Sequence, residues 1–134
     1  MKAMNIILLV FGLLTFQCST MSSNRDTTFK VEHTNINYIS IERYDLDNGA
    51  AKVSAKSKIK NTDYINKLVK DYLASNRREL NKFRKKYELI IFYNDGKQDA
   101  MITNGHFIKV DGQGVFKMDK NLDDFLEEGL KYSE

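Results

Sequence analysis

Several short segments of the chain have the pattern of β-strands. Most alternate between apolar and polar residues with the two-residue period of a half-buried strand, and residues 87–94 are apolar on both faces, as a central strand is. Two come early, at residues 36–44 and 51–59, and four come later, at residues 87–94, 97–103, 106–110 and 115–118. The chain has no proline, so Gly, Asn and Asp must supply the turns, and they do so at Asp47-Asn48-Gly49, Asp95-Gly96, Asn104-Gly105 and residues 111–114. The later segments are therefore predicted to form a four-stranded antiparallel meander.

The stretch between the two groups of strands has helical spacing. Thr62 can cap a helix whose apolar face is Ile65, Leu68, Val69, Tyr72 and Leu73. Leu80, Phe83 and Tyr87 continue that face in phase, but Asn76 interrupts it and would form a capping box with Glu79. The pattern leaves open whether residues 62–87 form one long helix or two short ones.

A closing helix is predicted to begin at Asn121, with an apolar face of Leu122, Phe125, Leu126 and Leu130. The order of elements predicts an α+β fold. Its antiparallel sheet, made of the meander and one or two N-terminal strands, is expected to pack against the long helix and the C-terminal helix.

Two-residue turns would fix which side chains share a face of the meander. One face is then nearly continuous hydrocarbon: Tyr87, Leu89, Ile91, Tyr93, Ala100, Ile102, Phe107, Phe116 and Met118. The other is mixed, with Ile90, Phe92, Met101, Ile108, Val110 and Val115 among Glu88, Asp99, Thr103, His106 and Lys117. Either the N-terminal strands or the last helix cover this mixed face, or it is an open surface that meets a protein partner. The candidate partner-binding residues are Ile90, Phe92, Met101, Ile108, Val115 and His106.

The N-terminus has the layout of an export signal. Lys2 is followed by an uncharged apolar run at residues 6–16, which is too short for a membrane-spanning helix of roughly 20 residues. Cys18, the only cysteine of the chain, follows directly. One thiol forms no internal disulfide, so a lipid acceptor explains its position better, with plain secretion or a retained anchor as the alternatives.

Leu14-Thr15-Phe16-Gln17-Cys18 resembles the lipobox of bacterial lipoproteins, in a loose form like that of Bacteroidetes lipoproteins. The resemblance implies a signal peptide at residues 1–17, lipid on Cys18, and anchoring in the cell envelope, in the outer membrane if the cell is Gram-negative. Residues 18–28 are small and polar and would form a flexible tether, which leaves residues 29–134 as a single domain.

Charge does not indicate nucleic acid as the partner. Without Lys2 the basic residues number 20 against 18 acids, so the net charge is near +2. Residues 60–86 are locally basic, which is typical of a solvated helix face. An exported protein would meet anionic lipid head groups, glycans or an acidic protein there rather than nucleic acid.

No catalytic or metal-binding motif is visible. His33 and His106 have no Cys, His or carboxylate at ligand spacing, and Asp45-Leu46-Asp47-Asn48-Gly49 lacks the ligand spacing of a calcium loop. No cofactor is expected. The sequence therefore favours a non-enzymatic binding module, such as an inhibitor, an immunity-type protein or an envelope accessory protein. A small envelope hydrolase with a site built from distant residues is the alternative.

Overall fold

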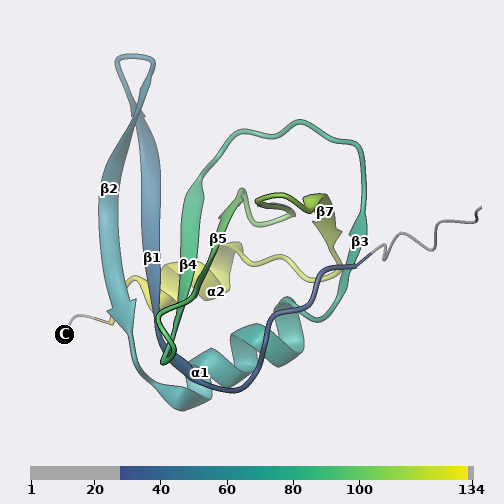
Figure 1. The fold of residues 1–134 in the computed structure, drawn as a ribbon. Helices are drawn as coiled ribbons and strands as arrows, with labels where there is room; N and C mark the ends of the chain where they lie inside the picture. The colour runs from purple at the N-terminus through teal and green to yellow at the C-terminus, as the bar shows by residue number, and fades with distance from the viewer. Residues whose placement is uncertain (1–27, 133–134) are drawn as a thin grey trace, which may run out of the picture.

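A computed structural model describes residues 28–132 and contains a single antiparallel sheet with two helical segments on it (Figure 1). The strands follow the order β2-β1-β4-β5-β6-β7-β3. Their bounds are β1 (Ile36–Asp47), β2 (Ala50–Ile59), β3 (Asn76–Arg78), β4 (Tyr87–Tyr93), β5 (Gln98–Thr103), β6 (Phe107–Val110) and β7 (Gly114–Met118). The helices are α1 (Thr62–Lys67), continued by the π-helical turn η1 (Leu68–Tyr72), and α2 (Asp123–Gly129). The α+β class is confirmed, while the sheet is larger and the helices shorter than predicted. No helix within residues 28–132 has the length and apolar character needed to cross a membrane.

One face of the sheet carries the hydrophobic core. Leu68 of η1 and Leu122 and Leu126 at α2 are fully buried against strand residues such as Ile41 and Leu89. The two helical segments also contact each other, because the Tyr64 ring stacks on the Phe125 ring at 4.3 Å and its hydroxyl donates to the Phe125 carbonyl at 2.8 Å. The apolar faces predicted for Ile65–Leu73 and for the closing helix are the ones that are buried.

The first hairpin forms as its turn residues predict. Asn48 and Gly49 have φ of +51° and +81°, as a two-residue turn between right-twisted strands requires, and Asp47 pairs with Ala50. Strand β1 pairs with β4 only as far as Arg43, so beyond that point β1 and β2 extend past the sheet as a two-stranded ribbon (Figure 1).

The second half of the predicted long helix is not helical. Asn76–Arg78 is strand β3, which pairs with β7 at one edge of the sheet, and no helix forms between residues 79 and 86. The proposed capping box is wrong, because the Asn76 side chain bonds to the backbone of Phe29 and Leu73 instead. Leu80, expected on a buried helical face, is fully exposed. Asn61, rather than Thr62, caps α1, and its Oδ1 accepts from Tyr64 N at 2.9 Å.

The faces predicted for β5 and β6 are also wrong, and the cause is a turn one residue longer than expected. Tyr93 N donates to Lys97 O at 2.9 Å, so Asn94, Asp95 and Gly96 all belong to the loop, with Gly96 in the left-handed region at φ +85°. Leu89 consequently pairs with Met101 instead of Ile102. The core side therefore receives Met101, Thr103, Ile108 and Val110, and the opposite side receives Ala100, Ile102 and Phe107.

A second three-residue loop, between Val110 and Gly114, shifts the register again by one residue. The two shifts cancel, so Phe116 and Met118 of β7 are buried as predicted. The predicted signal peptide, Cys18 and nearly all of the predicted tether lie outside the described residues.

Candidate binding face

The side of the sheet opposite the helices, here called the outer face, has no helix or strand of residues 28–132 packed across it. The predicted covering elements lie elsewhere, because β1 and β2 extend the sheet sideways and α2 joins the core. The loop before β4 reaches one end of the outer face, where the Phe83 ring lies 6.2 Å from the Phe107 ring. Register places these side chains on the outer face: Tyr38, Glu42, Tyr44, Lys56, Lys58, Glu88, Ile90, Phe92, Ile102, Phe107, Lys109, Val115 and Lys117.

Apolar side chains form two groups on the outer face. In the first, the rings of Tyr38 and Phe92 stack across β1 and β4 with centroids 4.4 Å apart, and Lys58 Nζ lies 4.3 Å above the Tyr38 ring. In the second, Ile102 and Val115 are half-buried on either side of Lys109. Half-buried apolar groups beside aromatic rings are typical of the centre of a protein interface.

A hydrogen-bonded network of charged residues lies beside these apolar groups, on β1, β2 and the start of β4. Tyr44 Oη lies 2.9 Å from a carboxylate oxygen of Glu42 and 2.9 Å from one of Glu88. Lys56 Nζ lies 2.6 Å from the other oxygen of Glu42, and Lys85 Nζ lies 3.3 Å from Glu88. Both carboxylates are thus paired with a cation, so they leave no unbalanced negative charge on the outer face.

The ionisation of this network follows from these contacts. The hydrogen bond from Lys56, and then that from Tyr44, hold the pKa of the Glu42 carboxyl below its usual value. Burial, together with hydrogen bonds to Glu88 and Glu42, raises the pKa of the Tyr44 hydroxyl. At neutral pH the Glu42 carboxyl is therefore charged and the Tyr44 phenol is neutral.

A shallow hollow of about 240 Å³ lies on the outer face between Ile102 and Lys109 and is bounded by Glu88 and Asp111. Pockets for small molecules usually have 300–1,000 Å³ and enclose most of the ligand. A hollow of this size and openness suits a single protruding side chain of a partner better than an enclosed small molecule.

The candidate residues from the sequence divide into three groups. Ile90, Phe92 and Val115 lie on the outer face as predicted. Met101 and Ile108 are only 2% and 0% exposed in the core, so their assignment to an open face is wrong. His106 is exposed in the loop between β5 and β6, with Nε2 3.5 Å from the Asn121 amide nitrogen.

The sequence analysis did not assign several residues to the outer face, among them Ile102, Phe107 and Tyr38. Ile102 and Phe107 were assigned to the core side because the loop at Asn94–Gly96 was taken to be one residue shorter. Tyr38 was recognised as a strand residue, but its contact with Phe92 depends on the pairing of β1 with β4, for which no local pattern exists.

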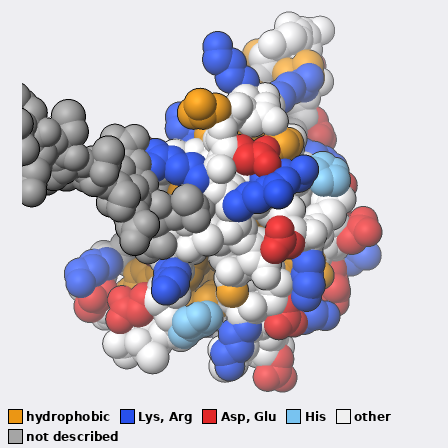
Figure 2. Space-filling view, turned by 90° about the vertical axis from the view of Figure 1, so that its right-hand side faces the viewer, with side chains coloured by type: hydrophobic (Ala, Val, Ile, Leu, Met, Phe, Trp, Pro, Cys, Tyr) orange, Lys and Arg blue, Asp and Glu red, His pale blue; other side chains and the backbone are white. Residues whose placement is uncertain are grey.

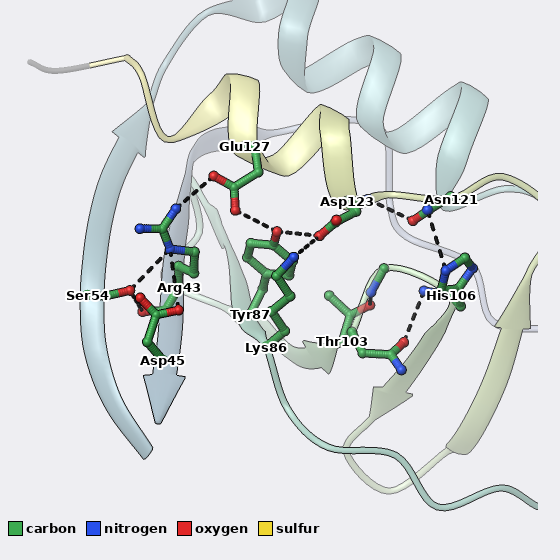
Figure 3. Close-up of polar contacts among 12 residues, drawn as sticks. Arg43, Asp45, Ser54, Lys86, Tyr87, Thr103, His106, Asn121, Asp123 and Glu127 are labelled. Atoms are coloured by element: carbon green, nitrogen blue, oxygen red, sulfur yellow. Dashed lines mark hydrogen bonds and ion pairs between the residues drawn. The ribbon is translucent and has the colours of Figure 1, made fainter. Parts of the chain in front are cut away.

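A second polar cluster lies on the core side at the start of α2 (Figure 3). Tyr87 Oη donates to the carboxylate of Asp123 and lies 2.7 Å from Glu127 Oε1. Lys86 Nζ donates to Asp123 at 2.6 Å, and Arg43 donates to Glu127 at 2.8 Å. A pair of carboxylates such as Asp123 and Glu127 could support the hydrolase alternative if one of them served as a general acid.

Burial, and then the bonds to Asp123 and Glu127, raise the pKa of the Tyr87 hydroxyl. Burial alone would raise the pKa of Asp123, but the hydrogen bonds from Lys86 and Tyr87 outweigh it and leave that pKa below its usual value. A general acid needs a raised carboxyl pKa, and Asp123 shows the opposite. The hydrogen bonds of this cluster join α2 to β1 and to the start of β4.

In the described part of the chain, no three His, Cys, Asp or Glu side chains are grouped as metal ligands would be. No protein-family model matches the chain, and no curated protein and no solved structure matches it either. The outer face is therefore interpreted from its own geometry alone.

Proposed function

We propose that the chain is an envelope lipoprotein whose domain binds another protein through the outer face, without catalysing a reaction. The observation that carries the proposal is the placement of both helices on one side of the sheet. This leaves Ile90, Phe92, Ile102 and Val115 half-buried on a side that no described element covers.

The outer face combines an apolar centre with charged surroundings. Lys109 and Lys117 make no ion pair within the described residues, so a partner can approach them without breaking one, while Lys58 lies over the Tyr38 ring. The Glu42–Tyr44–Glu88 network is already hydrogen-bonded in the free protein, so little conformational entropy is lost there on binding. An inhibitor, an immunity-type protein or an accessory to an envelope assembly would each use such a surface.

The test is capture of a partner from the producing cell's own envelope by variants of the outer face. Phe92→Glu and Ile102→Glu should abolish capture, because each places a charge at the apolar centre of the contact. Leu46→Glu is the matched control, since Leu46 is equally apolar and 50% exposed but lies on the projecting ribbon. Circular dichroism must show that all three variants are folded. Undiminished capture by folded Phe92→Glu and Ile102→Glu would exclude the outer face.

Membrane attachment is proposed on Cys18 and the apolar run before it. Cys18→Ala should prevent lipid labelling of the chain and release it from the membrane fraction. Normal processing and unchanged fractionation of the variant would show that Cys18 is not an acceptor. Attachment and partner binding are independent, so either part of the proposal can fail without the other.

A further inference from the structure

The β3 edge of the sheet carries a group of unpaired cations around Arg78. β3 is the last strand, and Arg78 pairs with Phe116 of β7. The guanidinium lies close to Gly114, since a Cβ built on that glycine would be 3.1 Å from Arg78 Nε. The exposed arginine side chain therefore lies along this edge of the sheet.

Two hollows meet at Arg78. One, of about 490 Å³, is bounded by Phe29, Lys30 and Gly112, and the other, of about 390 Å³, by Leu80 and Lys82. Lys30, Arg78 and Lys82 form no ion pair or side-chain hydrogen bond among residues 28–132. Glu79, the acidic residue beside them, is engaged by Arg77 at 3.0 Å. We call Lys30, Arg78, Lys82 and Leu80 the basic edge.

An exposed leucine stands among these cations. Leu80 is 105% exposed, the highest value among the large apolar side chains described. An apolar side chain beside lysine and arginine is typical of surfaces that touch lipid head groups, where the apolar group enters the interface and the cations meet phosphate.

The basic edge also lies where the chain comes from Cys18. Phe29 lines one of its hollows, and Figure 2, which faces this side of the molecule, shows Lys and Arg side chains near the point where the described chain begins. An 11-residue stretch spans at most about 40 Å when fully extended. A lipid on Cys18 would therefore keep this edge, more than the far edge at β2, close to the membrane surface.

The geometry points to the basic edge as a second membrane contact, which binds anionic phospholipid head groups and orients the tethered domain. This inference rests on the proposed lipid anchor. A single acyl chain holds a protein only weakly, and a basic patch is a common second signal. Each lysine or arginine near an anionic surface strengthens binding about fivefold.

The experiment uses residues 18–134 with Cys18→Ser, which retains every described residue and removes the lipid. Binding is measured by flotation with vesicles of phosphatidylglycerol and phosphatidylcholine at 30:70, and with pure phosphatidylcholine. We expect binding to the anionic vesicles only, and its loss when NaCl is raised tenfold. Arg78→Gln with Lys82→Gln should weaken binding about 25-fold.

The matched control is Lys52→Gln with Lys70→Gln, which removes the same charge from β2 and η1. It should leave vesicle binding within about twofold of the parent. Equal loss in both double variants would assign the effect to net charge and overturn the inference, as would failure to bind anionic vesicles. Binding to polyglutamate without binding to vesicles would indicate an acidic protein and would also overturn it. Because the protein carries no lipid and no partner is present, none of these results depends on lipidation of Cys18 or on the outer face.

Discussion

The side chain of Asn76 exchanges two hydrogen bonds with the backbone of Phe29. Oδ1 accepts from Phe29 N at 3.0 Å, and Nδ2 donates to Phe29 O at 3.2 Å. Nδ2 also donates to Leu73 O at 2.8 Å. One buried amide thus replaces a strand partner for Phe29 and joins the start of the domain to the β3 edge.

Asn76→Ala should destabilise the fold by about 1–3 kcal/mol, because it leaves the buried N–H and C=O of Phe29 without partners. Urea unfolding followed by fluorescence or circular dichroism measures the loss. Asn81→Ala is the control, since Asn81 is exposed and makes no hydrogen bond among the described residues. An Asn76→Ala protein as stable as the control would mean that water satisfies Phe29 equally well.

Met101 and Ile102 test the register of the sheet. Met101→Ala should cost about 2–5 kcal/mol, because it opens a cavity in the core, while Ile102→Ala should cost less than half as much. Both changes remove side chains of similar size from adjacent positions of β5. The reverse order of the two free energies of unfolding would restore the register with a two-residue turn at Asp95-Gly96.

The sequence predicts every strand except β3, but not which way two of them face. Asp95-Gly96 suits a two-residue turn and also the end of a three-residue loop, because Gly96 adopts positive φ in both. The length of this loop determines which side chains of β5 and β6 face the core. The three-residue loop after Val110 shifts the register once more, so the side chains of β7 face the predicted sides. The residue types in the turn do not determine whether the loop has two or three residues. The loop length follows from the fold, in which Met101 and Ile108 are buried.

The helical prediction for residues 76–87 failed for a different reason. Leu80, Phe83 and Tyr87 have helical spacing, but β7 offers an unpaired edge to Asn76–Arg78 and the fold uses it. Pairing across about 40 residues of sequence leaves no local pattern. The same limit applies to the outer face. The position of Phe92 on this face was predicted from the sequence, but its contact with Tyr38 was not.

Asp123 should contribute to stability in a pH-dependent way. Its pKa in the folded protein lies below the usual 3.8, because the bonds from Lys86 and Tyr87 outweigh the effect of burial. The contribution is therefore present above the pKa of the unfolded chain and is lost as the pH falls through the folded value. Between pH 5 and pH 2, Asp123→Asn should lose less stability than the parent.

The control for that titration is Asp124→Asn, since Asp124 forms no ion pair or side-chain hydrogen bond among the described residues. Parallel curves for all three proteins would show that the Asp123 contacts do not couple to folding.

Alanine substitutions at Gly105 and Gly96 can be compared to distinguish the effect of steric crowding from that of backbone strain. Both have positive φ, of +97° and +85°, so alanine is strained at each. A Cβ on Gly105 would also lie 2.7 Å from Asn121 Oδ1, which caps the start of α2, whereas Gly96 has open space around it. Gly105→Ala should thus be less stable than Gly96→Ala by about 1–3 kcal/mol in thermal or urea unfolding. Equal losses would show that the Asn121 side chain moves aside at no cost.

The projecting end of the β1–β2 hairpin has a consequence for how the molecule opens. Beyond Tyr44, whose N–H donates to Lys86 O at 2.8 Å, each of the two strands has only the other as a neighbour. Isolated two-stranded ribbons are marginally stable in water. The amides at the tip will therefore exchange with solvent by local separation of the ribbon, while those of Ile39 and Ile41, between β2 and β4, exchange only when the sheet itself opens. Amides of the single strand β1 will therefore exchange by two different routes. The boundary between them lies at Tyr44, which makes the last hydrogen bond to the segment that leads into β4.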